Sequence, residues 1–437
     1  MFTSHIVIGL GYGDEGKGSW VDHLIRRHSI RYVVRMNGGA QAGHNVVAPD
    51  GRSHIFAQLG AGSFVPETFT LLSRFMLVEP EALRNEANAF EQKGIFRPLG
   101  RVLISENAPI ITPFSRQLNR IQEVFRGASR HGSCGFGIGL TQGDVERLGD
   151  RALYMRDLNE KRLLREKLSF LGRCRLDEAE RYRNASTAPL IEEMANTDVD
   201  YYVESFWSLY QSVGVVEDGE IGEILASHPV VFEGAQGALL DQSYGFFPYV
   251  TRSNCTFENA MTLLEEAGFS GRLNRVGLLR GYATRHGAGP FVTEDPTLNL
   301  PPCTNATNPW QGQFRLGWFD AVAARYALKV VGGVDTLSIT NVDRMSALLS
   351  LKVAVRYDHS ASPFFEDGEL RAERFDYSAL AVRSAAMADI QPVYQELGGF
   401  GDRGLTGCAD YVEQISNLVG RNVEAYSLSA DCQKVYR

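Results

Sequence analysis

Nine residues near the N-terminus combine a phosphate-binding loop with two acidic side chains. The loop runs Gly11-Tyr12-Gly13-Asp14-Glu15-Gly16-Lys17-Gly18-Ser19. Glycines allow backbone N–H groups to turn toward an anion, and a helix N-terminus and a lysine add positive charge. This sequence is close to the phosphate-loop pattern G-x-x-x-x-G-K-[ST]. It differs at Gly18, which replaces the serine or threonine whose hydroxyl normally binds magnesium. Because Asp14 and Glu15 would repel phosphate, we expect this loop to do chemistry as well as hold a nucleotide.

Three further glycine-rich segments favour a large anionic ligand. They are Asn37–Asn45 with His44, His131–Gly139 with Ser133 and Cys134, and Phe232–Asp241 with Gln236. Each segment alone is equally compatible with a structural turn, and His44 with a surface histidine. A histidine among small residues can also donate a hydrogen bond to phosphate or act as a general acid. Beside the first loop, the three segments favour ligand contact over unrelated turns.

Alternating strand-like and helix-like stretches must position these loops. The first loop lies between an apolar run, Ile6–Ile8, and a stretch with helical spacing of apolar residues, Ser19–His28. Further strands are predicted at 32–35, 102–104, 229–233, 276–283, 336–340 and 349–355, and helices at 79–93 and 115–125. Such alternation predicts an α/β fold with a large central, mostly parallel sheet flanked by helices, whose ligand loops gather at the carboxyl ends of the strands. We expect one domain over residues 1–437, with a mostly helical insertion at about 156–215.

The composition narrows the class of protein. At 437 residues with 44% hydrophobic and 22% charged residues, the chain resembles a soluble enzyme. A net charge of −8 argues against a general nucleic-acid binder, and no apolar run approaches the roughly 18 residues that span a membrane. The N-terminus enters a strand almost at once, so we expect no signal peptide. Six scattered cysteines without a C-x-x-C pair argue against zinc and favour the cytoplasm.

Six stretches of the chain resemble the adenylosuccinate synthetase family, in the family's order from Ile6 to about Tyr436. They are GYGDEGKGSWVD, VVRMNGGAQAGHNVV, FEGAQGALLDQSYGFFPYVTRSN, ATRHGAGPFVTE, LGWFDAVAARYA and TNVDRM. The resemblance implies the family's fold and a ligase that condenses a 6-oxopurine nucleotide with aspartate, using a nucleoside triphosphate and Mg²⁺. It also implies a homodimer with shared sites.

The resemblance implies a mechanism in two steps. Asp14 would take the N1 proton of the purine, O6 would attack the γ-phosphate, and an amine would then displace phosphate at C6. His44 would stabilise charge at the phosphoryl bridge and act as an acid. Lys17 would bind phosphate oxygens, and Gln236 would contact the acceptor nucleotide. Asp14 and the backbone carbonyl of Gly43 would be the magnesium ligands.

The resemblance also implies two groups of nucleotide-binding residues. The phosphate loop contributes Gly13, Glu15, Gly16 and Gly18. The acceptor nucleotide would be contacted by Gln41, Ser133, Cys134, Arg147 and Thr251. Cys134 is a poorer hydrogen-bond donor than the threonine usual there. Arg147 matches an arginine that reaches across a dimer interface in the family. The alternative is that Arg147 is an ordinary surface arginine in contact with solvent.

The segment that binds aspartate in the family departs most from the family pattern. The segment from Pro309 to Trp318 keeps only Arg315. Gly312 stands at the position of the arginine that contacts the substrate carboxylate in the family, and Phe314 lies two residues further on. A substrate with two carboxylates needs bidentate cationic partners, whereas Trp310 and Phe314 offer apolar surface. Either Arg315 binds aspartate together with Arg285, or this loop binds a different amine.

Two other departures concern the nucleotides. Asn341 replaces a lysine beside Asp343, and the segment from Ser427 to Asp431 lacks the usual Gly-Pro, so ATP is an alternative to GTP. His286 replaces a valine in the stretch that faces the ribose in the family. This change either alters discrimination at the 2′-hydroxyl or is tolerated.

The sequence therefore predicts a purine nucleotide ligase. It would activate IMP or dGMP with GTP or ATP and add an amine, with L-aspartate favoured, giving adenylosuccinate or an analogue. The alternatives are the same activation with a different amine, and a non-catalytic nucleotide-binding paralogue. Intact Asp14, Lys17, His44 and Gln236 favour an enzyme, because a binding protein needs neither base nor acid. A viral branch of the family that uses dGMP tends to lack the aspartate in its first loop, so Asp14 favours the general reaction.

Overall fold

The computed structural model describes residues 2–301, 310–358, 363–400, 403, 405–428 and 435–436, without the side chains of 405, 406 and 436. Pro309 and Ser429–Asp431, named above in the predicted loops, lie outside the described residues. Cys303 and Cys432 lie outside them too.

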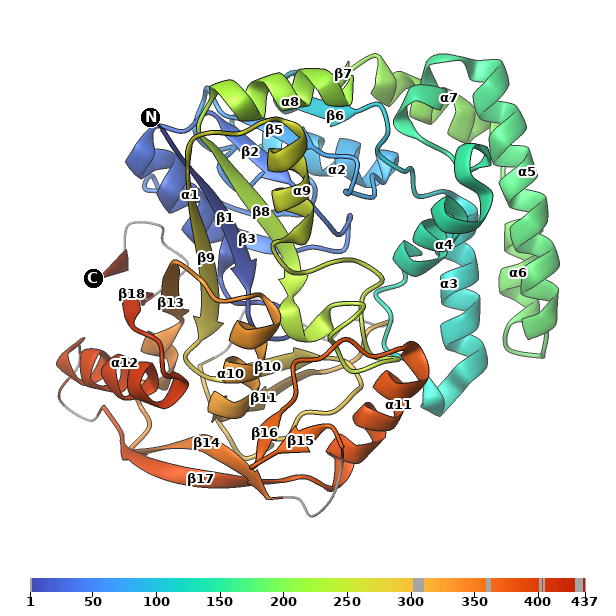
Figure 1. Cartoon of the computed structure of the whole chain (residues 1–437). Coiled ribbons are helices and arrows are strands. Elements are labelled where there is room, and N and C mark those ends of the chain that lie inside the picture. The colour runs from blue at the N-terminus through green and yellow to red at the C-terminus, as the bar shows by residue number, and fades with distance from the viewer. Residues whose placement is uncertain are drawn as a thin grey trace.

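A large sheet forms the centre of the molecule (Figure 1). Within the described residues it has ten strands, of which β19 alone is antiparallel to its neighbour. The order is β19 (Val435–Tyr436), β18 (Val423–Ser427), β13 (Thr336–Thr340), β9 (Arg272–Arg280), β1 (Thr3–Gly9), β8 (Val230–Gly237), β2 (Tyr32–Arg35), β5 (Phe69–Leu72), β6 (Val102–Ser105) and β7 (Gly214–Val216). The predicted α/β class with a large, mostly parallel sheet is confirmed.

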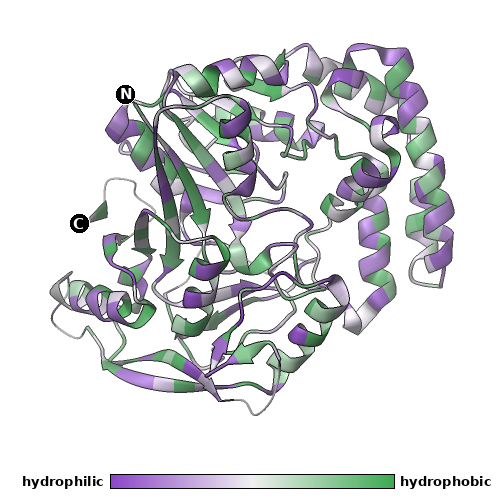
Figure 2. Ribbon diagram, viewed as in Figure 1, coloured by the Kyte–Doolittle hydropathy of each residue, from purple (hydrophilic) through white to green (hydrophobic). Residues whose placement is uncertain are grey.

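Both faces of the sheet are buried, as parallel sheets require. Successive side chains of β1 point to opposite faces, so Ile6 and Ile8 pack in one apolar cluster and Val7 packs in the other. Figure 2 shows hydrophobic strands between helices whose outer surfaces carry hydrophilic residues. The helices contributing to the Val7 face include α1 (Lys17–His28), α2 (Pro80–Glu91) and α3 (Pro113–Arg126). The opposite face is covered by α8 (Asp218–Ser227), α9 (Glu258–Glu266), α10 (Ala321–Val330) and α12 (Leu405–Val419).

The N-terminal strand–loop–helix unit forms as predicted. Helix α1 begins at Lys17, directly after Gly16, whose left-handed backbone (φ 78°) closes the loop. The helix buries Trp20, Val21 and Leu24 at helical spacing. This start places the loop's backbone N–H groups and the helix N-terminus at the carboxyl end of β1.

A group of helices lies beside the sheet, at the right of Figure 1. It contains α3, α4 (Ile138–Leu148), α5 (Lys161–Ala179), α6 (Ala188–Ala195) and α7 (Val199–Tyr210). The predicted insertion at 156–215 covers α5 to α7 and ends within β7. Its status as an insertion in a single domain stays a prediction.

Smaller sheets carry the remaining strands. They are β3 (His44–Val47) with β4 (Ser53–Phe56), β10 (Ala283–His286) with β11 (Phe314–Gly317), β15 (Phe365–Glu366) with β16 (Glu369–Leu370), and β12 (Phe319–Asp320) with β14 (Ser350–Asp358) and β17 (Gln391–Gly398). Helix α11 (Tyr377–Ala386) follows β16. Short 3-10 helices occur at Pro98–Arg101, Gly127–Ser129, Gly149–Arg151, Met155–Asn159, Glu180–Tyr182, Ala238–Leu240, Val342–Met345 and Met387–Asp389.

Two predicted strands differ from the structure. The single strand expected at 276–283 is two strands, β9 and β10, because the chain breaks at Gly281, whose N–H donates to the Thr340 carbonyl at 2.8 Å. The predicted glycine loop after Glu233 instead continues β8 as far as Gly237. A Cβ on Gly234 would lie only 3.0 Å from the Val7 carbonyl, so this glycine allows close strand packing.

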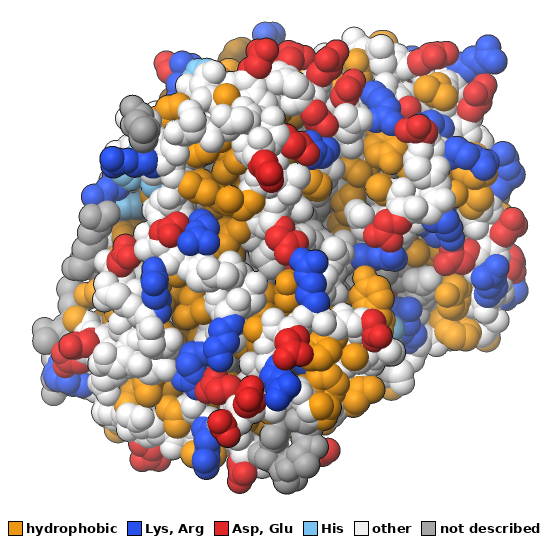
Figure 3. All heavy atoms as spheres, viewed as in Figure 1, with side chains coloured by type: hydrophobic (Ala, Val, Ile, Leu, Met, Phe, Trp, Pro, Cys, Tyr) orange, Lys and Arg blue, Asp and Glu red, His pale blue; other side chains and the backbone are white. Residues whose placement is uncertain are grey.

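Acidic and basic side chains are interspersed on the face shown in Figure 3. No helix in the described part of the chain has both the length and the apolar character needed to cross a bilayer.

Candidate active site

Three loops meet where the neighbouring strands β1, β8 and β2 end. The order β1-β8-β2 brings together the loop after β1, the end of β8 and the segment after β2. Asn37 links the last two, because its amide donates to the Ala235 carbonyl at 3.1 Å and accepts from the Ala235 N–H at 2.7 Å. Gln236 lies close to both of the other loops. If Gly38 carried a Cβ atom, that atom would lie 3.2 Å from Gln236 Oε1, and a Cβ atom on Gly13 would lie 3.9 Å from Gln236 Cα. The structure therefore places the loops that carry Asp14, His44 and Gln236 side by side.

The phosphate loop wraps around its own glutamate. Glu15 Oε1 accepts hydrogen bonds from the N–H groups of Gly11 at 3.1 Å and Gly13 at 2.7 Å. Lys17 Nζ donates to Glu15 Oε2 at 2.7 Å, and Glu15 is only 1% exposed. The carboxylate thus takes the donors that would otherwise face an anion, so a phosphate has to share or displace them.

Asp14 is held as a carboxylate at the edge of the loop. Its backbone is left-handed (φ 64°), and its carbonyl accepts from Arg280 at 3.1 Å. His286 Nε2 lies 3.2 Å from Asp14 Oδ2. Burial opposes the charged form, but the hydrogen bond from His286, with Arg280 and Lys17 nearby, holds the pKa of Asp14 below its ordinary value. A partly exposed carboxylate that stays charged suits a base or a cation ligand.

His44 forms a buried pair that the sequence reasoning missed. Its Nδ1 hydrogen-bonds Glu233 Oε1, and Glu233 Oε2 accepts from the Ala61 N–H at 3.0 Å. Burial favours the neutral acid, but Arg35 and His44 hold the pKa of Glu233 below its ordinary value. Burial lowers the pKa of His44, although the Glu233 carboxylate opposes this shift. The available signal was an acidic residue ending the apolar run Val230-Val231-Phe232.

The predicted magnesium ligands supply few protein oxygens. Among the described residues, no group of three or more His, Cys, Asp or Glu side chains could hold a metal. Mg²⁺ is usually bound by one or two carboxylates together with substrate phosphates and water. Asp14 and the carbonyl of Gly43 fit that mode, and His44, next to Gly43, packs 2.9 Å from where a Cβ on Gly18 would lie. The donor set therefore suits magnesium that arrives with a triphosphate.

Two buried amides in the site have polar atoms without partners. Both amide atoms of Gln41 are buried and make no hydrogen bond, and the same holds for Oε1 of Gln236. Gln236 also has a left-handed backbone (φ 56°). Because burying an unpaired amide costs free energy, these atoms are expected to bond to a polar ligand.

The other residues predicted to contact the acceptor nucleotide have different surroundings from one another. Ser133 donates to Asn119 Oδ1 at 2.8 Å. Cys134 packs in a small apolar cluster, and burial raises the pKa of its thiol. Thr251 is half-buried beside Leu240. Arg147 has a 60% exposed side chain and pairs with Asp144 on the same helix at 3.1 Å, so it projects to solvent.

The predicted base-binding segment lies against the phosphate loop. Thr340 Oγ1 donates to the Glu15 carbonyl at 2.9 Å, and Asn341 Nδ2 donates to Thr340 Oγ1 at 3.1 Å. Asp343 follows in a 3-10 helix. Ile339 pairs with Tyr426 in the sheet, which puts Ser427 beside Thr340. The predicted base-binding segment therefore adjoins the phosphate loop.

The predicted amine-substrate loop contacts the 132–135 loop directly and the phosphate loop through His286. Trp310 packs 3.0 Å from where a Cβ on Gly135 would lie. The Phe314 ring lies 4.7 Å from the ring of His286, which in turn touches Asp14. Gly312 adopts φ 97°, which favours glycine.

The two arginines expected to bind aspartate are bonded to the protein. Arg315 donates to Glu294 Oε2 at 2.7 Å and to the Gly289 carbonyl at 2.8 Å. Arg285 is 2% exposed and donates to three backbone carbonyls, those of Ala288, Pro290 and Tyr249. Both guanidinium groups are therefore already held by protein acceptors, although Arg315 Nε has no hydrogen-bond partner.

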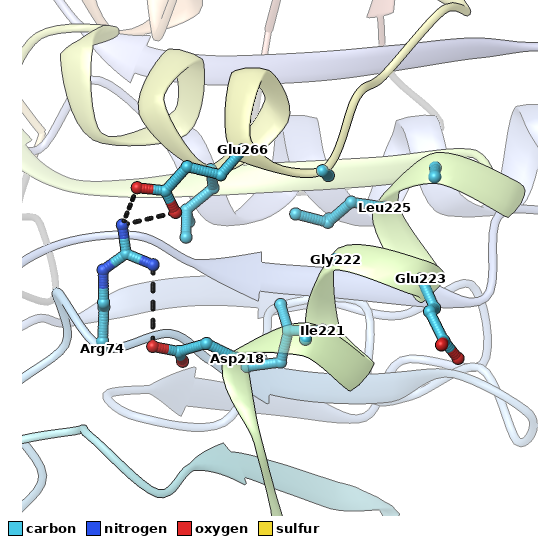
Figure 4. Close-up of a pocket in the computed structure, with 11 residues that line it drawn as sticks. Arg74, Asp218, Ile221, Gly222, Glu223, Leu225 and Glu266 are labelled. Carbon is cyan, nitrogen blue, oxygen red and sulfur yellow. Dashed lines mark hydrogen bonds and ion pairs between the residues drawn. The ribbon is translucent and has the colours of Figure 1, made fainter.

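A separate cavity of about 400 Å³ lies between α8 and α9 (Figure 4). Its basic residue, Arg74, bonds both carboxylate oxygens of Glu266 at 2.7 Å and lies 3.6 Å from Asp218. None of the predicted site residues lines this cavity, and the charge of Arg74 is already neutralised.

Comparison with known proteins gives a consistent result. The model of the adenylosuccinate synthetase family matches residues 6–436. An adenylosuccinate synthetase of Frankia alni is 33% identical over 439 residues, covering 96% of this chain and 95% of that relative. The enzyme of Thermosynechococcus vestitus is 34% identical over 413 residues, covering 90% and 83%.

Two solved structures share the fold. The fully ligated adenylosuccinate synthetase of Plasmodium falciparum aligns with a TM-score of 0.77 at 20% identity, covering 99% of each chain. The succinoaminodeoxyadenylate synthetase of cyanophage S-2L, bound to dGMP and to dATP as an energy donor, aligns with a TM-score of 0.58 at 16% identity, covering 100% of this chain and 95% of that one. At these identities the likeness concerns the fold.

Proposed function

Because the chain belongs to the adenylosuccinate synthetase family of C–N bond-forming ligases, we propose that it activates the 6-oxo group of a purine 5′-monophosphate and replaces that oxygen with an amine. The acceptor is IMP or dGMP, and the phosphoryl donor is GTP or ATP. The observation that carries this proposal is that the loops bearing Asp14, His44 and Gln236 lie side by side where β1, β2 and β8 end, next to a phosphate-binding type of loop.

Asp14 acts as the base in this proposal. Its carboxylate removes the proton from N1 of the purine, which makes O6 nucleophilic toward the γ-phosphate. The unpaired amides of Gln41 and Gln236 hold the acceptor nucleotide. Buried amides that need partners discriminate strongly between ligands that supply them and ligands that do not.

His44 and Lys17 act on the transferring phosphoryl group. His44, oriented by Glu233, donates to the bridging oxygen, and Lys17 moves from Glu15 toward phosphate oxygens. When bound through Asp14 and the Gly43 carbonyl, magnesium neutralises phosphate charge. The amine then attacks C6, and inorganic phosphate leaves with the former O6.

The amine donor is the finer part of the proposal. L-aspartate is the donor that the resemblance implies. A second candidate, an amine without two carboxylates, is favoured by one observation: Arg285 and Arg315 are both bonded to protein groups. Trp310 and Phe314 then provide apolar contact for that amine.

The assembly and location are proposed as well. A homodimer would give the exposed Arg147 a neighbouring site to reach. We place the protein in the cytoplasm, where thiols stay reduced, and the described cysteines Cys134, Cys174, Cys255 and Cys408 are all free.

An isotope experiment tests the reaction class. With Mg²⁺, GTP or ATP, and IMP labelled with ¹⁸O at the 6-position, the label is expected to appear in inorganic phosphate when an amine is supplied. Without an amine, bridging ¹⁸O in the triphosphate is expected to scramble, because phosphoryl transfer is reversible. A non-catalytic paralogue would show neither signal with IMP or dGMP across a broad panel of amines.

Replacing Arg315 with alanine tests the donor. If the amine lacks two carboxylates, kcat/KM for the preferred donor is expected to change by less than about threefold, because Arg315 is occupied by Glu294 and Gly289. A rise in KM of about tenfold or more that is confined to L-aspartate would restore aspartate as the donor. Steady-state phosphate release over a panel of donors measures both outcomes, with Arg403→Ala, an exposed arginine paired with Asp410, as the control.

A further inference from the structure

His286 joins the phosphate loop to the predicted amine-substrate loop. It ends strand β10 and pairs in register with Phe314 of β11. The two rings lie 4.7 Å apart with an interplanar angle of 52°. On its other side, Nε2 lies 3.2 Å from Asp14 Oδ2. The ring is therefore held between the proposed base and the loop proposed to receive the amine.

The two nitrogens of this ring have different surroundings. Nε2 faces the Asp14 carboxylate, which accepts hydrogen bonds only, so Nε2 carries the hydrogen. Nδ1 is buried and has no hydrogen-bond partner. In the neutral ring Nδ1 is then an acceptor, and a buried acceptor without a donor costs free energy. A donor group of a ligand would remove that cost.

The place of Asp14 indicates which donor this is. Asp14 is the proposed base for N1 of the purine, and C6 is bonded to N1. The amine must approach C6, so its N–H groups pass close to the ring that contacts Asp14. The resemblance implies that residue 286 faces the ribose, but its contact with Asp14 places the His286 ring on the side of the proposed base. The ribose is attached at N9, on the opposite side of the purine from the N1–C6 edge. The amine is therefore the nearer source of a hydrogen-bond donor.

We propose that His286 is a positioning residue with two roles, which holds Asp14 through Nε2 and orients the incoming amine through Nδ1. The proposal rests on the proposed function of the site. Phe314 fixes the plane of the imidazole, so both contacts depend on the β10–β11 pair. The inference applies equally to aspartate and to another amine, because it concerns only the attacking nitrogen.

Two substitutions separate the two roles. In His286→Gln, the side-chain amide reaches the position of Nε2 and keeps the bond to Asp14, but no atom replaces Nδ1. In His286→Asn, the amide lies near the position of Nδ1 and is too short to reach Asp14. The first step is measured as positional isotope exchange in the triphosphate without an amine. The second is measured as KM for the amine in the complete reaction.

The expected results are opposite for the two variants. His286→Gln should keep isotope exchange within about threefold of the wild-type rate and raise KM for the amine about tenfold, the loss of one hydrogen bond. His286→Asn should slow exchange about tenfold and leave KM for the amine within about threefold. His54→Gln, in the β3–β4 hairpin, is the matched control and should change neither quantity.

Three outcomes would overturn the proposal. If KM for the amine in His286→Gln equals the wild-type value, Nδ1 does not orient the amine. A change confined to the preference between IMP and its 2′-deoxy form would assign Nδ1 to the ribose. Equal losses of both quantities in both variants would show a merely structural role. Absence of exchange in the wild-type protein would instead refute the proposed function, and this inference with it.

Discussion

Replacing Asp14 with asparagine is expected to slow phosphorylation of the 6-oxygen by about 10²–10⁴-fold, the usual contribution of a positioned general base. Asparagine is the appropriate replacement because Asp14 has φ 64°, and asparagine tolerates the left-handed region better than alanine. It keeps the size of the side chain and can still accept a hydrogen bond from His286. The variant therefore removes the proton acceptor and the charge with little change in shape.

The rate is measured as transfer of ¹⁸O from labelled IMP to phosphate, with thermal melting as the test of folding. Asp50→Asn makes the same chemical change at an exposed carboxylate paired with Arg52, and it should leave the rate unchanged. An Asp14→Asn variant that keeps more than about a third of the wild-type rate would exclude Asp14 as the base.

Replacing His44 with asparagine is expected to reduce the rate of phosphoryl transfer by about 10²–10⁴-fold. The physical reason is its pairing with Glu233, which fixes the ring and stabilises positive charge on it during transfer. His54→Asn is a closely matched control, because His54 lies in the same β3–β4 hairpin and both histidines are 7% exposed. A similar loss in the control would show that the effect comes from damage to the hairpin.

Glu233→Gln extends this test to the partner of His44. If the two residues act as a unit, the double variant should be no slower than the slower of the two single variants. Additive losses would show that Glu233 does not act through His44. Because the charge of Glu233 also interacts with that of buried Arg35, thermal melting should accompany this variant. His44→Asn tests the same pair and leaves the carboxylate near Arg35 in place.

Much of the architecture followed from local patterns. Apolar β-branched residues before a glycine loop, and apolar residues at helical spacing after it, defined the unit β1–loop–α1. The alternation of such units along the chain predicted the parallel sheet, since right-handed crossovers place successive parallel strands in one sheet. The segment 276–283 was mispredicted because apolar content alone does not reveal the break at Gly281.

The site was less accessible to local reasoning. Asp14, Lys17, His44 and Gln236 were singled out from their loops and from the family resemblance, and the structure places their loops side by side. The positions at which this chain differs from the family pattern were harder to interpret. Arg315 and Arg285 could have faced a substrate, but only the structure shows them bonded to Glu294 and to backbone carbonyls.

The sequence by itself determined which residue types stand in each loop, because strand, glycine loop and helix are set by neighbouring residues. Only the tertiary structure decided which side chains meet. His44 and Glu233 are 189 positions apart and pair because β2 and β8 are neighbours in the sheet. Likewise, the β10–β11 ladder pairs His286 with Phe314, and the same histidine contacts Asp14 of the phosphate loop. The folded loop also directs the N–H groups of Gly11 and Gly13 at the carboxylate of Glu15. These contacts depend on strand order and register, which are fixed by burial over the whole sheet.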